Sequence, residues 1–352
     1  MNLYIKLFAL SISLVLTHVV TVHAAQSYGY NMSLFASLSS AQSAAIGGES
    51  NLFITEGGGI RKFPLPSTSG KIITTNVSNP SAVATDVANV YVVDSNNRIL
   101  LLTPSSNETY VQTVIATNET AATTNFTYSP NALYSANIGT IKGIAIDTNH
   151  NIYLSDSTKH VIWKLTPPAS TTGKYTLTLF AGVNGTSGAP ITGTTTKFNT
   201  PYGITFDPWG NLYVADLNNR VIQKIAISTT GAITNISVVA GQSGQYSGNN
   251  DGQAATSACL YLPKAVVFDQ TGSFYISNAY IDVVQYVSAA TGTIKVIAGG
   301  KSPSNNATSY NGIATGANFL GIGSLALDAK GNLYVTELNN NAVRKLTPTW
   351  HP

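Results

Sequence analysis

The chain is poor in charged residues and almost free of cysteine. Its 352 residues include 18 Lys and Arg, 15 Asp and Glu and one Cys, Cys259, so no disulfide framework can hold the fold together. No basic run offers the charged stripe that nucleic acid requires or a polybasic patch for a membrane surface, so neither partner is expected. Because 43% of the residues are hydrophobic, the chain can still bury a large core. Its stability must come from packing and backbone pairing.

Long apolar runs are also missing, with one exception at the N-terminus. Lys6 precedes an apolar stretch from Leu7 to about Val22, and small residues follow it. This is the pattern of a cleaved secretory signal, so residues 1–24 are predicted to be a signal peptide and residues 25–352 a secreted mature protein without membrane insertion. The alternative is an uncleaved anchor, because the stretch approaches the roughly 17 residues that a membrane span requires.

What the chain does contain is an internal repeat. Five segments fall into register around one aromatic position, and their markers are 62, 60, 62 and 59 residues apart. The markers are Tyr91, Tyr153, Tyr213, Tyr275 and Tyr334. A shorter copy precedes them, with Phe53 in place of Tyr. Such regular spacing predicts six copies of one supersecondary unit.

Each unit contains the signals of four short strands. In the unit that starts at Tyr202, "GITF", "LYVA", "RVIQKI" and "ISVVAG" alternate with polar turns such as "DPWGN" and "DLNN". Three hairpins in a row make a four-stranded antiparallel meander. Six meanders in series predict an all-β fold, a six-bladed β-propeller.

The two ends of the chain are expected to meet in one blade. "MSLFASL" at 32–38 resembles the fourth strand of a later unit, whereas the last unit stops after its third strand. The N-terminal strand is therefore predicted to complete the last blade, which removes the open edges that a linear row of sheets would leave.

The repeat resembles that of a known family. "PYGITFDPWGNLYVADLNNRVIQKI" and the glycine-rich segment after it are similar to the NHL repeat of extracytoplasmic six-bladed propellers. The resemblance covers nearly all of residues 25–352, which are expected to form one NHL-type propeller. It is weaker in the first two units, where "EGGGI" shortens a turn and "VATDVANV" lacks the turn glycine.

A polar position recurs at the end of the second strand of the units. Asp94 and Arg98, and likewise Asp216 and Arg220, are four residues apart, so a carboxylate can brace a guanidinium at the base of the turn. The same position holds Asp156, Asn278 and Glu337 in other units. Because a catalytic site needs its residues only once, this recurrence favours a structural role. The alternative is a polar ring at the channel mouth, formed by Asp94, Asp156, Asp216, Asn278 and Glu337, which could hold calcium through oxygen ligands.

No catalytic constellation stands out in the sequence. Some NHL-like propellers are lyases that hold zinc with histidines from several blades, but the mature chain has only His150, His160 and His351, which the repeat places too far apart. No metal ligand set is therefore assigned, and a structural Ca²⁺ is the one cofactor left open. The expected function is non-catalytic recognition, and the alternative is a calcium-dependent hydrolase or lyase that uses the channel mouth.

The long connections between units are the candidate recognition surface. Residues 118–140, 184–201, 241–263 and 300–321 join the fourth strand of one blade to the first of the next, on the face that also carries the turns between strands two and three. Tyr246 and Tyr310 are the candidate ligand contacts, because an aromatic ring in a Gly, Ser and Asn loop supplies contact area at low entropic cost. The expected partner is a protein or glycan at the cell surface or in the matrix, bound by a monomer.

Eight Asn-x-Ser/Thr sequons are candidate glycosylation sites. They are Asn31, Asn76, Asn107, Asn118, Asn125, Asn184, Asn235 and Asn306. A chain this rich in Asn, Ser and Thr would contain about six or seven by composition alone, so their number is no evidence of glycosylation.

Overall fold

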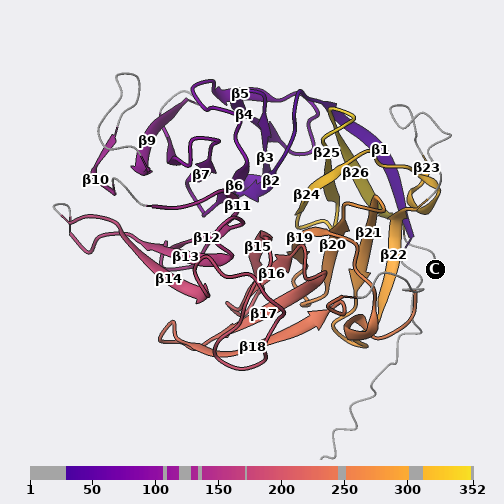
Figure 1. Ribbon diagram of the computed structural model, residues 1–352. Coiled ribbons are helices and arrows are strands. Elements are labelled where there is room, and N and C mark those ends of the chain that lie inside the picture. The colour runs from indigo at the N-terminus through magenta and orange to yellow at the C-terminus, as the bar shows by residue number, and fades with distance from the viewer. Residues whose placement is uncertain are drawn as a thin grey trace, which may run out of the picture.

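The computed structural model describes residues 29–105, 109–118, 128–133, 137–170, 173–244, 251–300 and 312–349. Over these ranges the chain forms six sheets arranged in a ring, each built on four antiparallel strands, with one edge strand of each sheet nearest the centre (Figure 1). The chain is therefore an all-β, six-bladed propeller, as the repeat predicts. Among the described residues the helices are three 3-10 turns, Gly48–Ser50, Ala255–Ser257 and Ala314–Gly316. No helix in this part of the chain has the length and apolar character that crossing a membrane requires.

The blades are numbered in chain order. Blade I consists of β2 (Ala44–Gly47), β3 (Asn51–Glu56), β4 (Gly59–Pro64) and β5 (Lys71–Thr74), and blade II of β6 (Ala82–Thr85), β7 (Val90–Val93), β8 (Ile99–Pro104) and β9 (Tyr110–Ala116). Blade III consists of β11 (Ile141–Ile146), β12 (Ile152–Asp156), β13 (Val161–Thr166) and β14 (Thr176–Gly182), and blade IV of β15 (Pro201–Phe206), β16 (Leu212–Asp216), β17 (Val221–Ile227) and β18 (Ile233–Ala240). Blade V consists of β19 (Pro263–Phe268), β20 (Phe274–Asn278), β21 (Val283–Val287) and β22 (Ile294–Gly299), and blade VI of β24 (Ile322–Leu327), β25 (Leu333–Glu337), β26 (Ala342–Thr349) and β1 (Gly29–Ser37).

Blade VI joins the two ends of the chain. β1 runs antiparallel to β26, from the pair Gly29 and Thr349 to the pair Ser37 and Ala342, and it occupies the place that a fourth strand holds in other blades. Two blades carry an additional outer strand: β23 (Gly312–Ile313) pairs with β1, and β10 (Tyr128–Leu133) pairs in parallel with β9.

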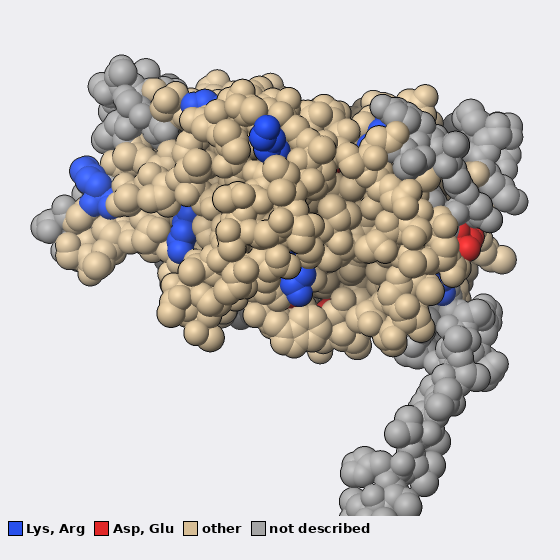
Figure 2. Space-filling view, turned by 60° about the horizontal axis from the view of Figure 1, so that its bottom comes forward, with Lys and Arg blue, Asp and Glu red and all other residues tan. Residues whose placement is uncertain are grey.

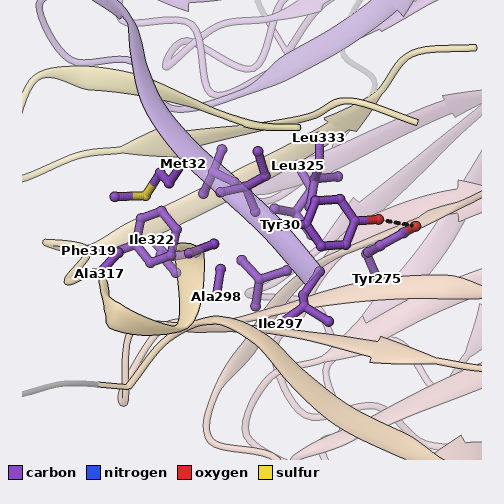
Figure 3. Close-up of a cluster of buried hydrophobic side chains, with 14 of the residues drawn as sticks. Tyr30, Met32, Tyr275, Ile297, Ala298, Ala317, Phe319, Ile322, Leu325 and Leu333 are labelled. Atoms are coloured by element: carbon purple, nitrogen blue, oxygen red, sulfur yellow. Dashed lines mark hydrogen bonds between the residues drawn. The ribbon is translucent and has the colours of Figure 1, made fainter. Parts of the chain in front are cut away.

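Apolar side chains fill the space between neighbouring blades. Near the chain ends, Tyr30 and Met32 of β1 pack with Leu325 and Leu333 of blade VI, and the Tyr30 hydroxyl lies 2.8 Å from that of Tyr275 in blade V (Figure 3). The blades are therefore held together by shared clusters as well as by the chain that connects them.

The aromatic marker of the repeat has a double role. Tyr153 is buried, and its ring lies 5.2 Å from that of Phe206 in the next blade, at an angle of 81°. Its hydroxyl donates a hydrogen bond to Asp147, in the turn between strands one and two. Asp147 also accepts the backbone N–H groups of Asn149 and Asn151. The spacing from Asp to Tyr therefore recurs because one carboxylate closes the turn and orients the ring that packs between two blades.

Candidate functional site

Two faces of the ring are built differently. We define the loop face as the one that carries the turns between strands two and three, such as 217–220 and 279–282, together with the connections that enter each blade. The turn face is the opposite one, with the turns between strands one and two, such as 147–151 and 207–211. The two sets of turns lie on opposite faces because β16 and β20 each run from the turn face to the loop face.

The recurring polar position lies at the base of the loop face and is buried. All six side chains at this position are at most 7% exposed: Glu56, Asp94, Asp156, Asp216, Asn278 and Glu337. The residues that line the central cavity belong to the first strands or directly precede them, with Leu338 from a loop-face turn, and none of the six is among them. The expected ring at the channel mouth is therefore corrected by the structure, because these side chains face hydrogen-bond partners inside their own blades.

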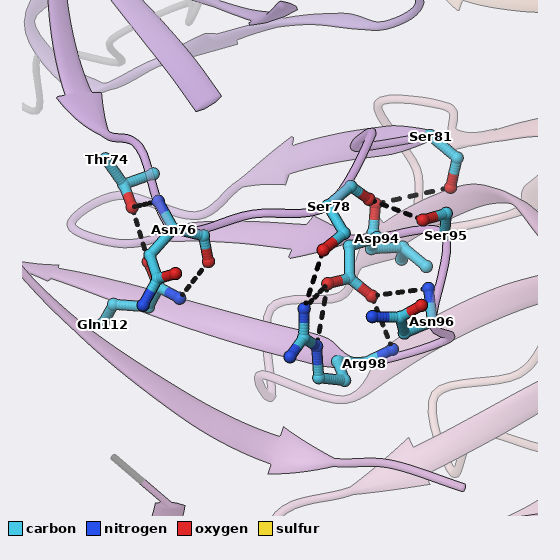
Figure 4. Close-up of polar contacts among 10 residues, drawn as sticks. Thr74, Asn76, Ser78, Ser81, Asp94, Ser95, Asn96, Arg98 and Gln112 are labelled. Carbon is cyan, nitrogen blue, oxygen red and sulfur yellow. Dashed lines mark hydrogen bonds and ion pairs between the residues drawn. The ribbon is translucent and has the colours of Figure 1, made fainter. Parts of the chain in front are cut away.

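The predicted brace between carboxylate and guanidinium is present in blade II. Arg98 Nη2 lies 2.5 Å from Asp94 Oδ2, Arg98 Nε lies 2.8 Å from the same oxygen, and both side chains are buried (Figure 4). Arg98 also donates to the hydroxyl of Ser78, which precedes the blade. The ion pair thus holds both the turn and the incoming chain.

In the other blades the partner comes from strand three, at a position that sequence reasoning missed. Asp216 accepts from Gln223, Glu337 from Arg344 at 2.6 Å, and the equivalent partners of Glu56, Asp156 and Asn278 are Arg61, Trp163 and Gln285. The signal was a polar or bulky residue at the same place in each third strand, as in "RVIQKI" and "NAVRKL". Because Glu337 and Arg344 are both fully buried, each depends on the other for its charge to be compensated.

Asp216 shows how completely such a side chain is engaged. It accepts three hydrogen bonds of 2.7 Å, from the backbone N–H of Asn199 and the side-chain amides of Asn219 and Gln223. Burial raises the pKa of Asp216 to about 7, although the three hydrogen bonds act in the opposite direction. A carboxylate enclosed in this way serves the fold and is inaccessible to a ligand.

In blades IV and VI, side chains from two neighbouring blades hold the incoming connection from two sides. The connection into blade VI is held by Glu337 of the same blade, which accepts the N–H of Leu320, and by Asp282 of blade V, which accepts the N–H of Ile322. The connection into blade IV is held by Asp216 and by His160 of blade III, whose Nδ1 accepts the N–H of Thr200. The base of each of these two connections is therefore fixed, and the variable part begins beyond these anchors.

A central cavity of about 330 Å³ runs along the axis of the ring. Its walls are the first strands of all six blades, which pack closely around the axis. At Gly143, for example, a Cβ would lie only 2.4 Å from the carbonyl oxygen of Tyr202 in the next blade. Small residues at this level let the innermost strands approach one another.

The loop-face end of the cavity carries two lysines around one tyrosine. Lys142, Tyr202 and Lys264 occupy the same register position in blades III, IV and V and line the cavity. The Nζ atoms of Lys142 and Lys264 each lie 5.8 Å from the centroid of the Tyr202 ring. Burial lowers the pKa of Lys264, the charge of Asp282 opposes this shift, and the charge of Lys142 adds to it.

The histidines do not form a common site in the described chain. His150 lies on the turn face with its Nδ1 3.1 Å from Asp86 of blade II, whereas His160 lies on the loop face. His351 is outside the described residues. Over the described ranges, no group of three or more His, Cys, Asp or Glu side chains is placed to hold a metal ion.

The remaining predicted residues are the two candidate tyrosines and the sequon asparagines. Tyr246 and Tyr310 lie outside the described residues, as do Asn107, Asn125 and Asn306. Four sequon residues are exposed: Asn31, Asn76, Asn184 and Asn235. The side-chain amide of Asn118 is half-buried and bonds both the N–H and the carbonyl of Ile138.

Charged side chains do not gather on the surface that Figure 2 shows. Lys and Arg stand apart from one another there, and little of the surface is acidic. Recognition on this side of the molecule would depend on shape, aromatic rings and hydrogen bonds more than on a charged patch.

Comparison with known proteins identifies the family of the repeat and one relative in sequence. The Teneurin NHL domain family matches residues 129–347. The protein SUPPRESSOR OF QUENCHING 1, chloroplastic, from Arabidopsis thaliana is 25% identical over 204 residues, which are 56% of this chain and 18% of that protein. The chain therefore spans less than a fifth of the length of this relative.

Solved structures with the same fold include binding proteins and enzymes. An auxiliary nutrient binding protein from Bacteroides ovatus superposes with a TM-score of 0.66 and 19% identity, over 92% of this chain and 77% of that one. A gluconolactonase from Xanthomonas campestris gives a TM-score of 0.53 and 11% identity, over 91% and 90%. At these identities the likeness is one of fold, and function has to be argued from the residues of this chain.

Proposed function

The chain belongs to the Teneurin NHL domain family, and from this premise we propose that it is a secreted, monomeric, non-catalytic recognition module. Its loop face binds a protein or a glycan at the cell surface or in the matrix. The observation that carries the proposal is the double clamp at the base of that face. Side chains from two neighbouring blades, such as Glu337 and Asp282, fix the connection where it enters blade VI, so its distal part can vary without loss of the fold.

Part of the connection 241–263 belongs to the core of the fold. In 241–263, Ala255, Ala258, Cys259 and Leu260 are buried. These residues belong to the packing of the fold, and shortening the whole connection would damage it. The segment proposed for recognition is therefore the part nearer Tyr246, before the 3-10 turn.

The test compares one exposed aromatic side chain on each face. Tyr280 is 73% exposed in a loop-face turn, and Trp209 is 66% exposed in a turn-face turn. Labelled mature chain, residues 25–352, is applied to a glycan array and to cultured cells with and without protease treatment. We expect Tyr246→Ala, Tyr310→Ala and Tyr280→Ala to weaken binding, and Trp209→Ala to leave it unchanged. Equal losses from both faces would contradict the assignment of the loop face.

The alternative is a calcium-dependent hydrolase or lyase that uses the channel mouth. A gluconolactonase has the same fold, so the fold is compatible with such an enzyme. Metal analysis of the purified mature chain separates the two functions. Stoichiometric Ca²⁺ that is lost together with a lactone-hydrolysing activity would favour the enzyme, whereas ligand binding that survives a chelator supports the recognition module.

A further inference from the structure

The channel mouth holds a positive charge that the fold itself does not require. The register position of Lys142, Tyr202 and Lys264 is occupied by Gln42, Ser81 and Gly323 in the other three blades, and all six line the cavity. An uncharged residue is therefore compatible with the packing at this position. The two lysines lie in blades on either side of the one that supplies the tyrosine.

These two ammonium groups are only weakly compensated. No salt bridge joins Lys142 or Lys264 to an acid within the described ranges. The acid that acts on Lys264 is Asp282, whose Oδ1 already accepts the N–H of Ile322 at 2.9 Å. Contact with the Tyr202 ring offsets part of the cost of partial burial, since a cation near an aromatic face is attracted by the electrons of the ring. An anion between the two lysines would gain from both charges.

The rest of the cavity suits a small molecule. Each first strand is an edge strand of its sheet, so the edge that faces the axis can offer backbone N–H and C=O groups to a ligand. Toward the turn face the strands that line the cavity carry apolar residues, among them Ile146, Phe206 and Phe268. A volume of about 330 Å³ lies at the lower end of the roughly 300–1,000 Å³ that small-molecule sites have. The cavity is therefore large enough for a small molecule and excludes a folded partner.

We propose that the channel mouth is a binding site for a small organic carboxylate, whose head group lies between Lys142 and Lys264 and whose body extends down the axis of the ring. The head group is held by charge, and Tyr202 keeps the two lysines oriented toward it. This site is distinct from the loop-face contacts proposed above. It can be occupied whether or not a macromolecule binds the loops.

The test uses two matched pairs of probes with the mature chain. D-glucuronate against D-glucose and benzoate against benzamide each change the charge while keeping the ring, and the two acids distinguish a sugar body from an apolar one. Titration calorimetry at low salt should show saturable binding of at least one acid, at least tenfold tighter than its neutral analogue. Raising the salt concentration should weaken that binding, because screening acts on the ion pair.

Variants then locate the site. Lys142→Gln with Lys264→Gln should reduce the affinity for the acid at least tenfold, whereas Lys174→Gln with Lys330→Gln, which removes two exposed turn-face charges, should not change it. Circular dichroism of each variant checks that the fold is retained. Equal affinity for acid and neutral analogue, no effect of the channel variant, or no saturable binding of either acid up to about 10 mM would overturn the proposal. None of these results bears on the glycan array, so failure here leaves the loop-face proposal intact.

Discussion

Phe35 is the side chain with which β1 connects the last blade to the first. Its ring lies 5.0 Å from that of Tyr334 in blade VI and 5.2 Å from that of Phe63 in blade I, and it is 6% exposed. Replacing a buried Phe by Ala costs about 3–5 kcal/mol, because the apolar contacts are lost and a cavity remains. We expect Phe35→Ala to lower the free energy of unfolding by this amount, a large part of the roughly 5–15 kcal/mol that stabilises a typical domain.

The control lies next to it on the same strand. Leu34 is 40% exposed, so Leu34→Ala should cost no more than about 1 kcal/mol. Urea unfolding, followed by tryptophan fluorescence and by circular dichroism, gives both values for the mature chain. If Phe35→Ala unfolds at the same urea concentration as Leu34→Ala, the joint between blades VI and I contributes little, and the reasoning is wrong.

Removing β1 altogether should have a still larger effect. Deleting residues 26–40 takes away four buried side chains, Tyr30, Met32, Phe35 and Leu38. At about 1.5–3 kcal/mol for each, the loss is roughly 6–12 kcal/mol, which is comparable to the whole stability of a domain. The truncated chain should therefore be unfolded or aggregated. A cooperative transition at the temperature of the full mature chain would refute closure through β1.

Three further outcomes are expected. Since burial raises the pKa of Asp216 to about 7, above its ordinary value of about 3.9, the folded state holds this proton more tightly, and stability should fall as the pH rises from about 4 to 7. Urea unfolding over that range should show a shallower pH dependence for Asp216→Asn, and identical slopes would contradict the assignment. Asp147→Ala should lower the free energy of unfolding by about 2–3 kcal/mol, measured in the same assay, because buried donors in its turn lose their acceptor. Mass spectrometry of secreted protein should find an N-terminus at or near Ala25, and intact Met1 on membrane-embedded protein would defeat the signal-peptide prediction.

The parts of the fold that repeat were predictable from the sequence. Tyr153 and its equivalents marked the units because an aromatic ring at this position packs between blades, and in blades II, III, IV and VI the Tyr hydroxyl also bonds the Asp of the turn. The pair of Asp94 and Arg98 was predictable because the two residues are close in the chain. The equivalent partners in other blades, such as Arg344 for Glu337, come from the facing strand. Finding them required the register of that hairpin, which the sequence did not specify.

The direction in which the recurring polar side chains point could not be inferred from the sequence. A carboxylate at the end of a strand can point toward the axis or toward its own hairpin, and both orientations satisfy the repeat. The structure selects the second, because the backbone N–H groups of the incoming connection need acceptors where they pass over the blade, as Asn199 does at Asp216. The recurrence of these acids therefore reflects the repeated need to anchor a connection.

A ligand site in a repeat protein is to be sought where the blades differ. At the register position of Lys142, the six blades carry Gln42, Ser81, Lys142, Tyr202, Lys264 and Gly323 around a single cavity. A position with a packing role would hold similar residues in every blade, as Tyr153 and its equivalents do. Variation in size, charge and aromaticity at one level of the channel indicates that packing does not determine the residue type there. The cluster of two lysines and a tyrosine on one side of this level is therefore available for binding. The sequence contained these residues, but only closure of the ring brings three residues about 60 positions apart in the chain to one side of the same opening.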